Sequence, residues 1–262
     1  MALQISANLG HLWQDLALPD AVRAAASAGF DAVEFHAPFS TDVDELSEAI
    51  SETGLPVISL NTRFSASTGD YGLAAVPGRE ADARARIDEA VQYAAAIGAR
   101  NVSVLAGCAP RSTESDTTYV SNIGYASKQA RREAVGILIE PINTTSFPGY
   151  YLSRLDHGLE VIENVGAENV SLMVDCFHTS IMEGDVFSAI EPHLEHVGHI
   201  QISSVPDRAE PDHGDLDYAE LLKAIAETGG YNGVYGAEYN PLETVEAGLA
   251  WLDAWHRWEG LT

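Results

Sequence analysis

Four side chains with oxygen donors follow short apolar runs of the kind that form buried strands. One such run ends at Glu140, and similar runs carry Asp175, Gln201 and Glu238. Three carboxylates close together are unfavourable without a positive partner, because each one opposes ionisation of the others. These runs contain no Lys, and Arg208 is the one Arg nearby. Carboxylate and amide oxygens are hard ligands, so the set predicts a bound divalent cation, Mg²⁺ or Mn²⁺.

Two glutamates around one metal ion can also move protons on a substrate. A Mg²⁺ or Mn²⁺ ion chelated by a hydroxyl and the adjacent carbonyl stabilises an enediolate. Of Glu140 and Glu238, one can take the proton next to the carbonyl while the other returns a proton to the neighbouring carbon. This chemistry is aldose–ketose isomerisation or epimerisation next to a carbonyl. Hydride transfer is disfavoured because the sequence lacks a nucleotide-binding motif.

Three further residues are candidates for contacts around these four. His178 follows Asp175 by three positions and is expected in the loop after its strand, where it can donate a hydrogen bond to a substrate oxygen. Arg208 lies in a later loop, and its guanidinium matches the two oxygens of a substrate carboxylate. Glu34 ends an early apolar run and is expected either to hold the substrate or to orient a ligand.

The elements that position these residues alternate regularly along the chain. Short runs rich in β-branched residues predict strands at 3–9, 31–37, 56–62, 101–107, 135–142, 171–177, 197–203 and 233–239. Segments with helical periodicity lie between them at 18–28, 42–52, 80–97, 119–132, 155–165, 183–194, 218–228 and 242–258. Several of the predicted helices end at a glycine, such as Gly29 and Gly98, which favours a C-cap.

Eight strand–helix units predict an α/β fold, a single (β/α)8 TIM barrel that occupies residues 1–262 as one domain. The alternative is an open doubly wound sheet, whose usual sign is a Gly-rich turn after the first strand. That turn reads Asn-Leu-Gly-His-Leu at 8–12 and has no GxGxxG pattern. The carboxyl ends of barrel strands form the active-site mouth, so the candidate residues are expected to meet there. The long loop 63–78 is expected to cover it.

Composition narrows the partners of the 262-residue chain. Asp and Glu number 39 against 14 Lys and Arg, for a formal net charge of −25. Nucleic acid is disfavoured because phosphate binding requires clustered Lys and Arg, and an anionic membrane is disfavoured for the same reason. The N-terminus lacks the pattern of a signal peptide, and no apolar run is long enough to span a bilayer. We therefore expect a cytoplasmic protein with a small-molecule substrate.

Several stretches together resemble the hydroxypyruvate isomerase family, within the wider group of xylose isomerase-like barrels. The resemblance covers essentially the full length, and its stretches are 5–9, 29–35, 76–80, 139–143, 175–178, 182–184, 198–202 and 236–239. It implies interconversion of hydroxypyruvate and 2-hydroxy-3-oxopropanoate. Glu140 and Glu238 would be the proton donor and acceptor and also metal ligands, with Asp175 and Gln201 completing the metal site. The sugar 3-epimerases usually carry His where Gln201 stands, which favours the isomerase branch.

The substrate side of the resemblance is less complete. His178 and Arg208 match residues that contact the substrate in relatives, and Asn61 is a further candidate contact. The family's usual His-Asn after the third strand is Leu60-Asn61 here, and its Ala-Asp-Asn-Pro after the seventh strand is Ser-Ser-Val-Pro at 203–206. Substrates larger than hydroxypyruvate, such as a longer 2-oxo sugar acid or a ketose, therefore remain open for an isomerase or a 3-epimerase.

Two interpretations from other classes also remain. A non-catalytic barrel that binds a metal or a sugar would retain its ligand after loss of Glu140. An endonuclease-like barrel with a zinc cluster requires more His ligands at strand ends and a basic face. A homo-oligomer is possible, since Trp251, Trp255 and Trp258 form a stripe on the last predicted helix.

Overall fold

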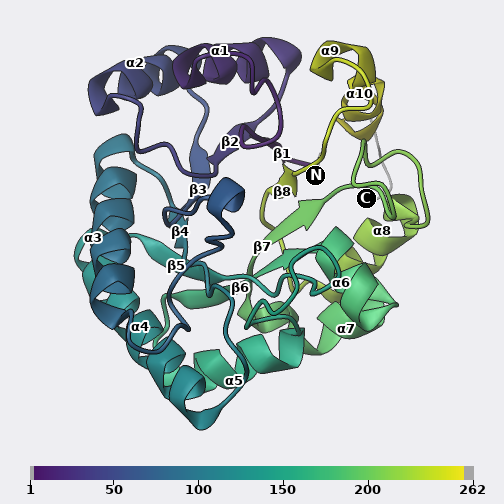
Figure 1. Ribbon diagram of the computed structural model, residues 1–262. Coiled ribbons are helices and arrows are strands. Elements are labelled where there is room, and N and C mark those ends of the chain that lie inside the picture. Colours follow the sequence, from purple (N-terminus) through teal and green to yellow (C-terminus); the bar gives the residue numbers. More distant parts are fainter. Residues whose placement is uncertain (1–2, 257–262) are drawn as a thin grey trace.

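Eight parallel strands close into one barrel in the order β1 to β8, so each strand pairs with its neighbours in sequence and β1 pairs with β8. The computed structural model describes residues 3–256. Helices surround the strands on all sides, as Figure 1 shows. The strands are β1 Ile5–Asn8, β2 Ala32–Phe35, β3 Val57–Asn61, β4 Asn101–Ser103, β5 Gly136–Ile139, β6 Val170–Asp175, β7 Val197–Ile202 and β8 Tyr235–Ala237. This architecture confirms the predicted (β/α)8 barrel.

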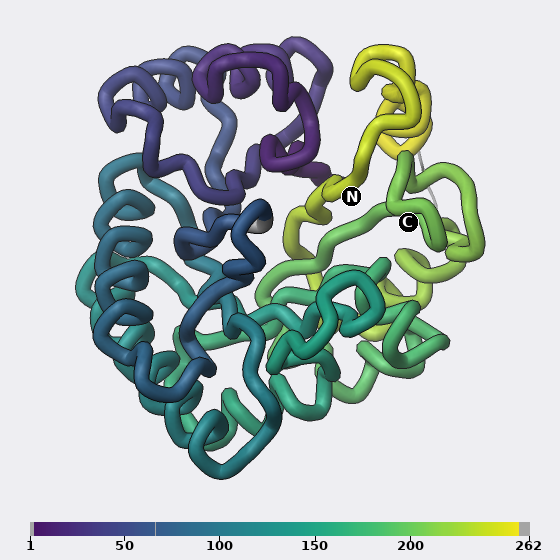
Figure 2. The backbone as a smooth tube through the Cα atoms, in the orientation of Figure 1, coloured from purple at the N-terminus to yellow at the C-terminus, as the bar shows by residue number. Residues whose placement is uncertain are grey.

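The helices follow the predicted alternation, but the described part of the predicted helix 242–258 is divided into two helices, and two other predicted helices also differ. They are α1 Leu18–Ala28, α2 Val43–Thr53, α3 Glu80–Ile97, α4 Thr113–Arg132, α5 Leu155–Val165, α6 Cys176–Glu183, α7 Val186–Ile190, α8 Tyr218–Thr228, α9 Val245–Gly248 and α10 Ala250–His256, with 3-10 turns η1 Ala66–Thr68 and η2 Glu191–His196. Figure 2 shows the chain travelling once around the ring, which brings its first and last described segments together.

The predicted helix ends are confirmed where glycine supplies a left-handed residue. Gly29 ends α1 with φ of 92°, and Gly98 ends α3 with φ of 70°. Helix α4 begins at Thr113, earlier than the predicted 119, because Ser112 and Ser115 form a reciprocal capping box at its start. The predicted helix 183–194 is wrong in detail, since α6 starts directly after β6, and α7 and η2 follow it.

The register of the last three strands aligns the site. Asp175 on β6 pairs with Gln201 on β7, and Gln201 pairs with Gly236 on β8. Gly236 leaves a space that Glu34 from β2 fills, since a Cβ atom there would lie 2.2 Å from the Glu34 carboxylate. The absence of a side chain on β8 therefore lets a carboxylate cross the inside of the barrel.

The last described helix, α10, contributes to the hydrophobic core. Trp251 on α10 is buried and packs edge-on against Phe30 and Tyr239. Trp255 packs against Trp251 and Tyr218. These two tryptophans thus have partners within their own chain, while Trp258 lies outside the described residues. Within residues 3–256, no helix combines the length and the apolarity that a bilayer crossing requires.

Candidate active site at the carboxyl ends of the strands

A cavity of about 270 Å³ opens at the carboxyl ends of the strands. Both predicted catalytic residues, Glu140 and Glu238, line it, together with the predicted contacts His178, Arg208 and Asn61. The loop 63–78 contributes Phe64 and Tyr71, as expected of a covering loop. The remaining lining residues are Gly10, His11, His36, Leu105, Ile142, Phe147 and Tyr150.

The other three predicted residues lie beneath this cavity. Asp175, Gln201 and Glu34 are 1%, 2% and 1% exposed. Glu34 accepts a hydrogen bond from Gln201 Nε2 at 2.9 Å and another from Ser6. Two roles were predicted for Glu34. Its bond to Gln201, a predicted metal ligand, fits the role of orienting a ligand residue, and Glu34 does not line the cavity.

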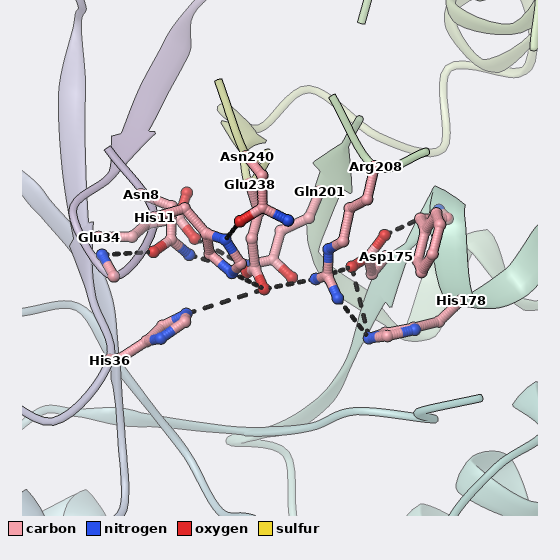
Figure 3. A network of polar contacts seen from close by, with 12 residues as sticks. Asn8, His11, Glu34, His36, Asp175, His178, Gln201, Arg208, Glu238 and Asn240 are labelled. Atoms are coloured by element: carbon pink, nitrogen blue, oxygen red, sulfur yellow. Dashed lines mark hydrogen bonds and ion pairs between the residues drawn. The ribbon is translucent and has the colours of Figure 1, made fainter. Parts of the chain in front are cut away.

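Arg208 places a positive charge among the carboxylates for which the sequence predicts a bound metal ion. Its Nη2 atom donates to Asp175 Oδ2 at 2.8 Å and to Glu238 Oε1 at 2.6 Å (Figure 3). Its guanidinium also lies over the Phe177 ring, 5.0 Å from the centroid. The residue has φ of 55°, and its loop therefore turns in a way that strand periodicity does not reveal. The guanidinium and a bound cation would compete for the same two carboxylates.

The two glutamates have opposite electrostatic surroundings. Burial, with the nearby charges of Glu238 and Asp175, raises the pKa of Glu140 well above its usual value. Burial opposes ionisation of Glu238 too, but the positive charge of Arg208 holds its pKa well below its usual value. Asn8 fixes the Glu238 carboxylate by donating to Oε2 at 2.8 Å. The pair thus combines a carboxylic acid with a carboxylate, which is the arrangement of a general acid and a general base.

His178 is oriented by a residue to which the sequence analysis gave no role. Asn143 Oδ1 accepts a hydrogen bond from the Ser146 N–H at 2.7 Å, so its amide nitrogen faces His178 Nδ1 at 2.6 Å. With Nδ1 as acceptor, the ring proton lies on Nε2. Nε2 is 3.8 Å from Glu140 Oε1 and 3.6 Å from Asp175 Oδ2, beyond hydrogen-bonding distance. His178 thus faces the site from helix α6 rather than from the predicted loop, with Nε2 3.4 Å from Arg208 Nη1, so the Nε2 proton and a guanidinium N–H are directed at the same space.

The donor set at this end of the barrel fits a hard divalent cation. Glu140, Asp175 and Glu238 contribute carboxylates, and Gln201 Oε1 is buried without a hydrogen-bond partner among the described residues. An amide oxygen in that state is a ready ligand for Mg²⁺ or Mn²⁺. His178 lies within reach of Glu140 and Asp175 as a third donor, but its protonated Nε2 does not ligate a metal.

Two lining residues were missed in the sequence analysis, His11 and His36. Both follow strands at their carboxyl ends, after β1 and after β2. The strand-end rule gave only Glu34 from the first two strands, and it would have found these histidines had it included the residues that follow each strand. Their rings lie beside Glu238, with Nε2 atoms 3.4 and 3.8 Å from its Oε1.

Comparisons with known proteins identify the family of this barrel. A family profile described as xylose isomerase-like TIM barrel matches residues 22–255. The 2-oxo-tetronate isomerase of Cupriavidus necator is 40% identical over 95% of this chain and 97% of its own length. The hydroxypyruvate isomerase of Escherichia coli is 35% identical over 96% of this chain and 98% of its own. A crystal structure titled AP endonuclease, family 2, from Brucella melitensis superposes with a TM-score of 0.91 at 33% identity, covering 97% of this chain and 99% of that one.

Proposed function

The chain belongs to the xylose isomerase-like TIM barrel family, and we propose that it interconverts hydroxypyruvate and 2-hydroxy-3-oxopropanoate. One observation carries the proposal: Glu140 and Glu238 line the same cavity with pKa values displaced in opposite directions. Relatives with nearly full coverage are named isomerases of hydroxypyruvate and of 2-oxo-tetronate. The net charge of −25 opposes the binding of nucleic acid, although one similar structure is titled an endonuclease.

The proposed reaction moves one proton off carbon and another onto it. Glu238, as the carboxylate, takes a proton from C3 of hydroxypyruvate. Glu140, as the acid, delivers a proton to C2, and the proton of the C3 hydroxyl moves to the C2 oxygen. The aldehyde then stands at C3 and the hydroxyl at C2, with no hydrogen gained or lost. Paired carboxyls with separated pKa values suit this exchange.

Two neighbours are proposed to hold the substrate. The buried Nε of Arg208 has no hydrogen-bond partner among the described residues, so it can join the terminal nitrogens in binding a carboxylate. The Nε2–H of His178 can donate to an oxygen of the intermediate, where negative charge develops. Asn61 lines the cavity and is proposed as a further contact.

We further propose that Glu140, Asp175, Gln201 and Glu238 hold Mg²⁺ or Mn²⁺. The unpartnered Oε1 of Gln201 supports this proposal. Such an ion, when bound, supplies a Lewis acid that stabilises enediolate charge. Because Arg208 already bonds Asp175 and Glu238, loading requires the guanidinium to share or release these oxygens.

Proton NMR of hydroxypyruvate in D₂O tests the proposal directly. As the aldehyde product appears, deuterium is expected at its C2, where Glu140 delivers a proton exchanged with solvent, and at C3 of hydroxypyruvate through reversal of the abstraction. A chelator is expected to stop both product formation and exchange. Glu140→Gln is expected to abolish product formation, whereas Glu133→Gln, which changes an exposed glutamate at the end of α4, is expected to leave it unchanged. If the wild-type protein gives no deuterium exchange and no product, hydroxypyruvate is rejected as the substrate.

A longer substrate is the second candidate. The relative from Cupriavidus necator, named for 2-oxo-tetronate, is 40% identical to this chain. The cavity also continues past Glu238 to His11 and His36. The same NMR experiment with 2-oxo acids and ketoses of rising chain length separates the candidates, because kcat/KM is expected to peak at the natural length.

A further inference from the structure

Two imidazole nitrogens converge on Glu238 Oε1, the oxygen that also accepts a hydrogen bond from Arg208. His11 Nε2 lies 3.4 Å from Glu238 Oε1, and His36 Nε2 lies 3.8 Å from the same oxygen, with all three donors within 4.8 Å of one another. Figure 3 shows both rings pointing toward the Glu238 carboxylate. We propose that His11, His36 and Glu238 form a second divalent cation site, which shares Glu238 with the all-oxygen set. Its two imidazoles and one carboxylate suit Zn²⁺ or Co²⁺.

The tautomer of His11 supports a ligand role. Its Nδ1 lies 2.9 Å from Asn240 Oδ1, which accepts the Nδ1 proton. The Nε2 atom then carries a lone pair and faces Glu238. His178 has the opposite arrangement, since Asn143 donates to its Nδ1 and leaves the proton on Nε2. A ligating histidine typically donates its other N–H to an oxygen, as His11 does to Asn240.

The backbone makes room for the second ring. A Cβ atom at Gly10 would lie 2.2 Å from His36 Cγ, so only glycine lets this imidazole occupy its place. The far side of the His36 ring contacts Phe64 edge-on at a centroid distance of 5.7 Å. Asn8 accepts the Gly10 N–H at 2.9 Å and donates to Glu238, which ties the turn beneath the rings to the third ligand. The three donors are therefore positioned before any ion arrives.

The spacing and the charge match a cation. Tetrahedral zinc with ligand distances of about 2.0–2.1 Å sets its donors about 3.3–3.5 Å apart. The His11–Glu238 separation of 3.4 Å meets this value, and the His36–Glu238 separation of 3.8 Å exceeds it by a few tenths of an ångström. One of the three donors is a carboxyl oxygen, a ligand type that binds cations. Both rings are partly exposed to the cavity, at 15% and 23% of their side chains, so an open coordination position faces it.

A Co²⁺ titration of the whole protein in saturating Mg²⁺ tests the site. One equivalent of Co²⁺ is expected to bind with the visible absorption of a low-coordinate nitrogen-ligated ion. His11→Gln and His36→Phe are each expected to weaken this binding by at least about 100-fold, more than the loss of an outer partner causes. His36→Phe keeps a ring against Gly10 and Phe64. The control His196→Gln, which changes a histidine at the other end of β7, is expected to change nothing.

Two comparisons decide between this site and the all-oxygen one. Glu140→Gln is expected to leave Co²⁺ binding intact, because Glu140 belongs only to the oxygen set. Unchanged affinity in both histidine variants, or loss of the absorption in Glu140→Gln, would overturn the proposal. Asn240→Ala gives an independent reading should a histidine variant fold poorly, with an expected weakening of about 10–100-fold. The readout is binding, so it stands apart from the isomerase assay.

Discussion

Replacing Arg208 by Gln removes the positive charge from the centre of the site. Arg208 joins two buried carboxylates, Asp175 at 2.8 Å and Glu238 at 2.6 Å. Its side chain is 13% exposed, and that of Asp175 is 1% exposed. The substitution therefore leaves two carboxylates facing each other without a counter-charge, in a protein that has been stripped of divalent metal.

The expected cost follows from this burial. Removing one partner of a buried ion pair typically costs about 3–5 kcal/mol, because the remaining charge stays desolvated. For a chain of this size, about 1 kcal/mol shifts the melting temperature by roughly 2–4 °C. Metal-free Arg208→Gln is accordingly expected to melt at least about 6 °C below the wild type at pH 8. Saturating Mg²⁺ is expected to recover part of this loss, since a bound cation supplies the missing charge.

The loss of stability caused by Arg208→Gln is expected to depend on pH. Burial raises the pKa of Asp175 to about 6 even though Arg208 opposes the shift, so the variant's Asp175 titrates higher still. Its folded state then binds more protons than the unfolded state, and its stability falls as pH rises through that range. Glu238 acts in the same direction, because the wild type gains stability above pH 4–5 from its lowered pKa and the variant does not. The difference between the two proteins should be small near pH 4 and largest near pH 8.

Urea unfolding at pH 5, 6.5 and 8 in the presence of chelator measures this difference. Arg132→Gln is the matched control, because Arg132 is exposed near the end of α4 and, among residues 3–256, its side chain bonds only a neighbouring Gln in the same helix. The control is expected to stay within about 0.5 kcal/mol of the wild type. Equal stability of Arg208→Gln and wild type at pH 8, or a penalty that grows toward acid pH, would refute the counter-ion role assigned to Arg208.

Three other substitutions probe the site, each with a separate measurement. Metal-free Glu140→Gln is expected to be more stable than the wild type in urea unfolding at pH 8, because it removes a buried carboxyl whose pKa is raised. The gain in free energy of unfolding is about 1.4 kcal/mol for each unit by which that pKa is raised. The difference between the two proteins should disappear toward pH 4. Gly236→Ala is expected to lose about 1–3 kcal/mol by overpacking in thermal unfolding, while Gly124→Ala in open space on α4 should gain about 0.5–1 kcal/mol. Asn143→Ala is expected to lower kcat about tenfold or more, and ¹⁵N NMR of His178 should show a changed tautomer.

The strand-end rule located the glutamates because it depends only on chain direction. In a parallel barrel, whatever follows an apolar strand lies at the mouth, and Glu140 and Glu238 both line the cavity there. The same rule could not separate the rim from the layer below it. Asp175 and Gln201 end their strands inside the barrel, and Glu34 fills the space that Gly236 leaves. Depth depends on the shear of the barrel and on a missing side chain across the sheet, which no single strand reveals.

Loops and helix starts were harder to predict for a different reason. Arg208 reaches the carboxylates from a loop with a left-handed residue, so its position follows from backbone turns and not from any period. The number of carboxylates at the strand ends therefore predicted a metal ion as the counter-charge, and the contribution of Arg208 to that counter-charge was not predicted. His178 was expected in a loop, but Asp175 caps α6 by accepting the Phe177 N–H at 2.8 Å, and the helix begins at once. One carboxylate thus ends a strand, caps a helix and bonds Arg208.

The position of Arg208 links the binding of a divalent ion to the binding of a substrate carboxylate. A fixed cation among buried carboxylates lets the barrel fold without metal, because the like charges do not have to meet unpaired. The same guanidinium is the natural partner of a substrate carboxylate, and it cannot bind Asp175, Glu238 and a substrate equally well at once. If a divalent ion takes over the two carboxylates, the guanidinium becomes available to a 2-oxo acid. Metal binding and substrate binding would then favour each other through one side chain, and Arg208→Gln should remove that coupling along with the metal-free stability.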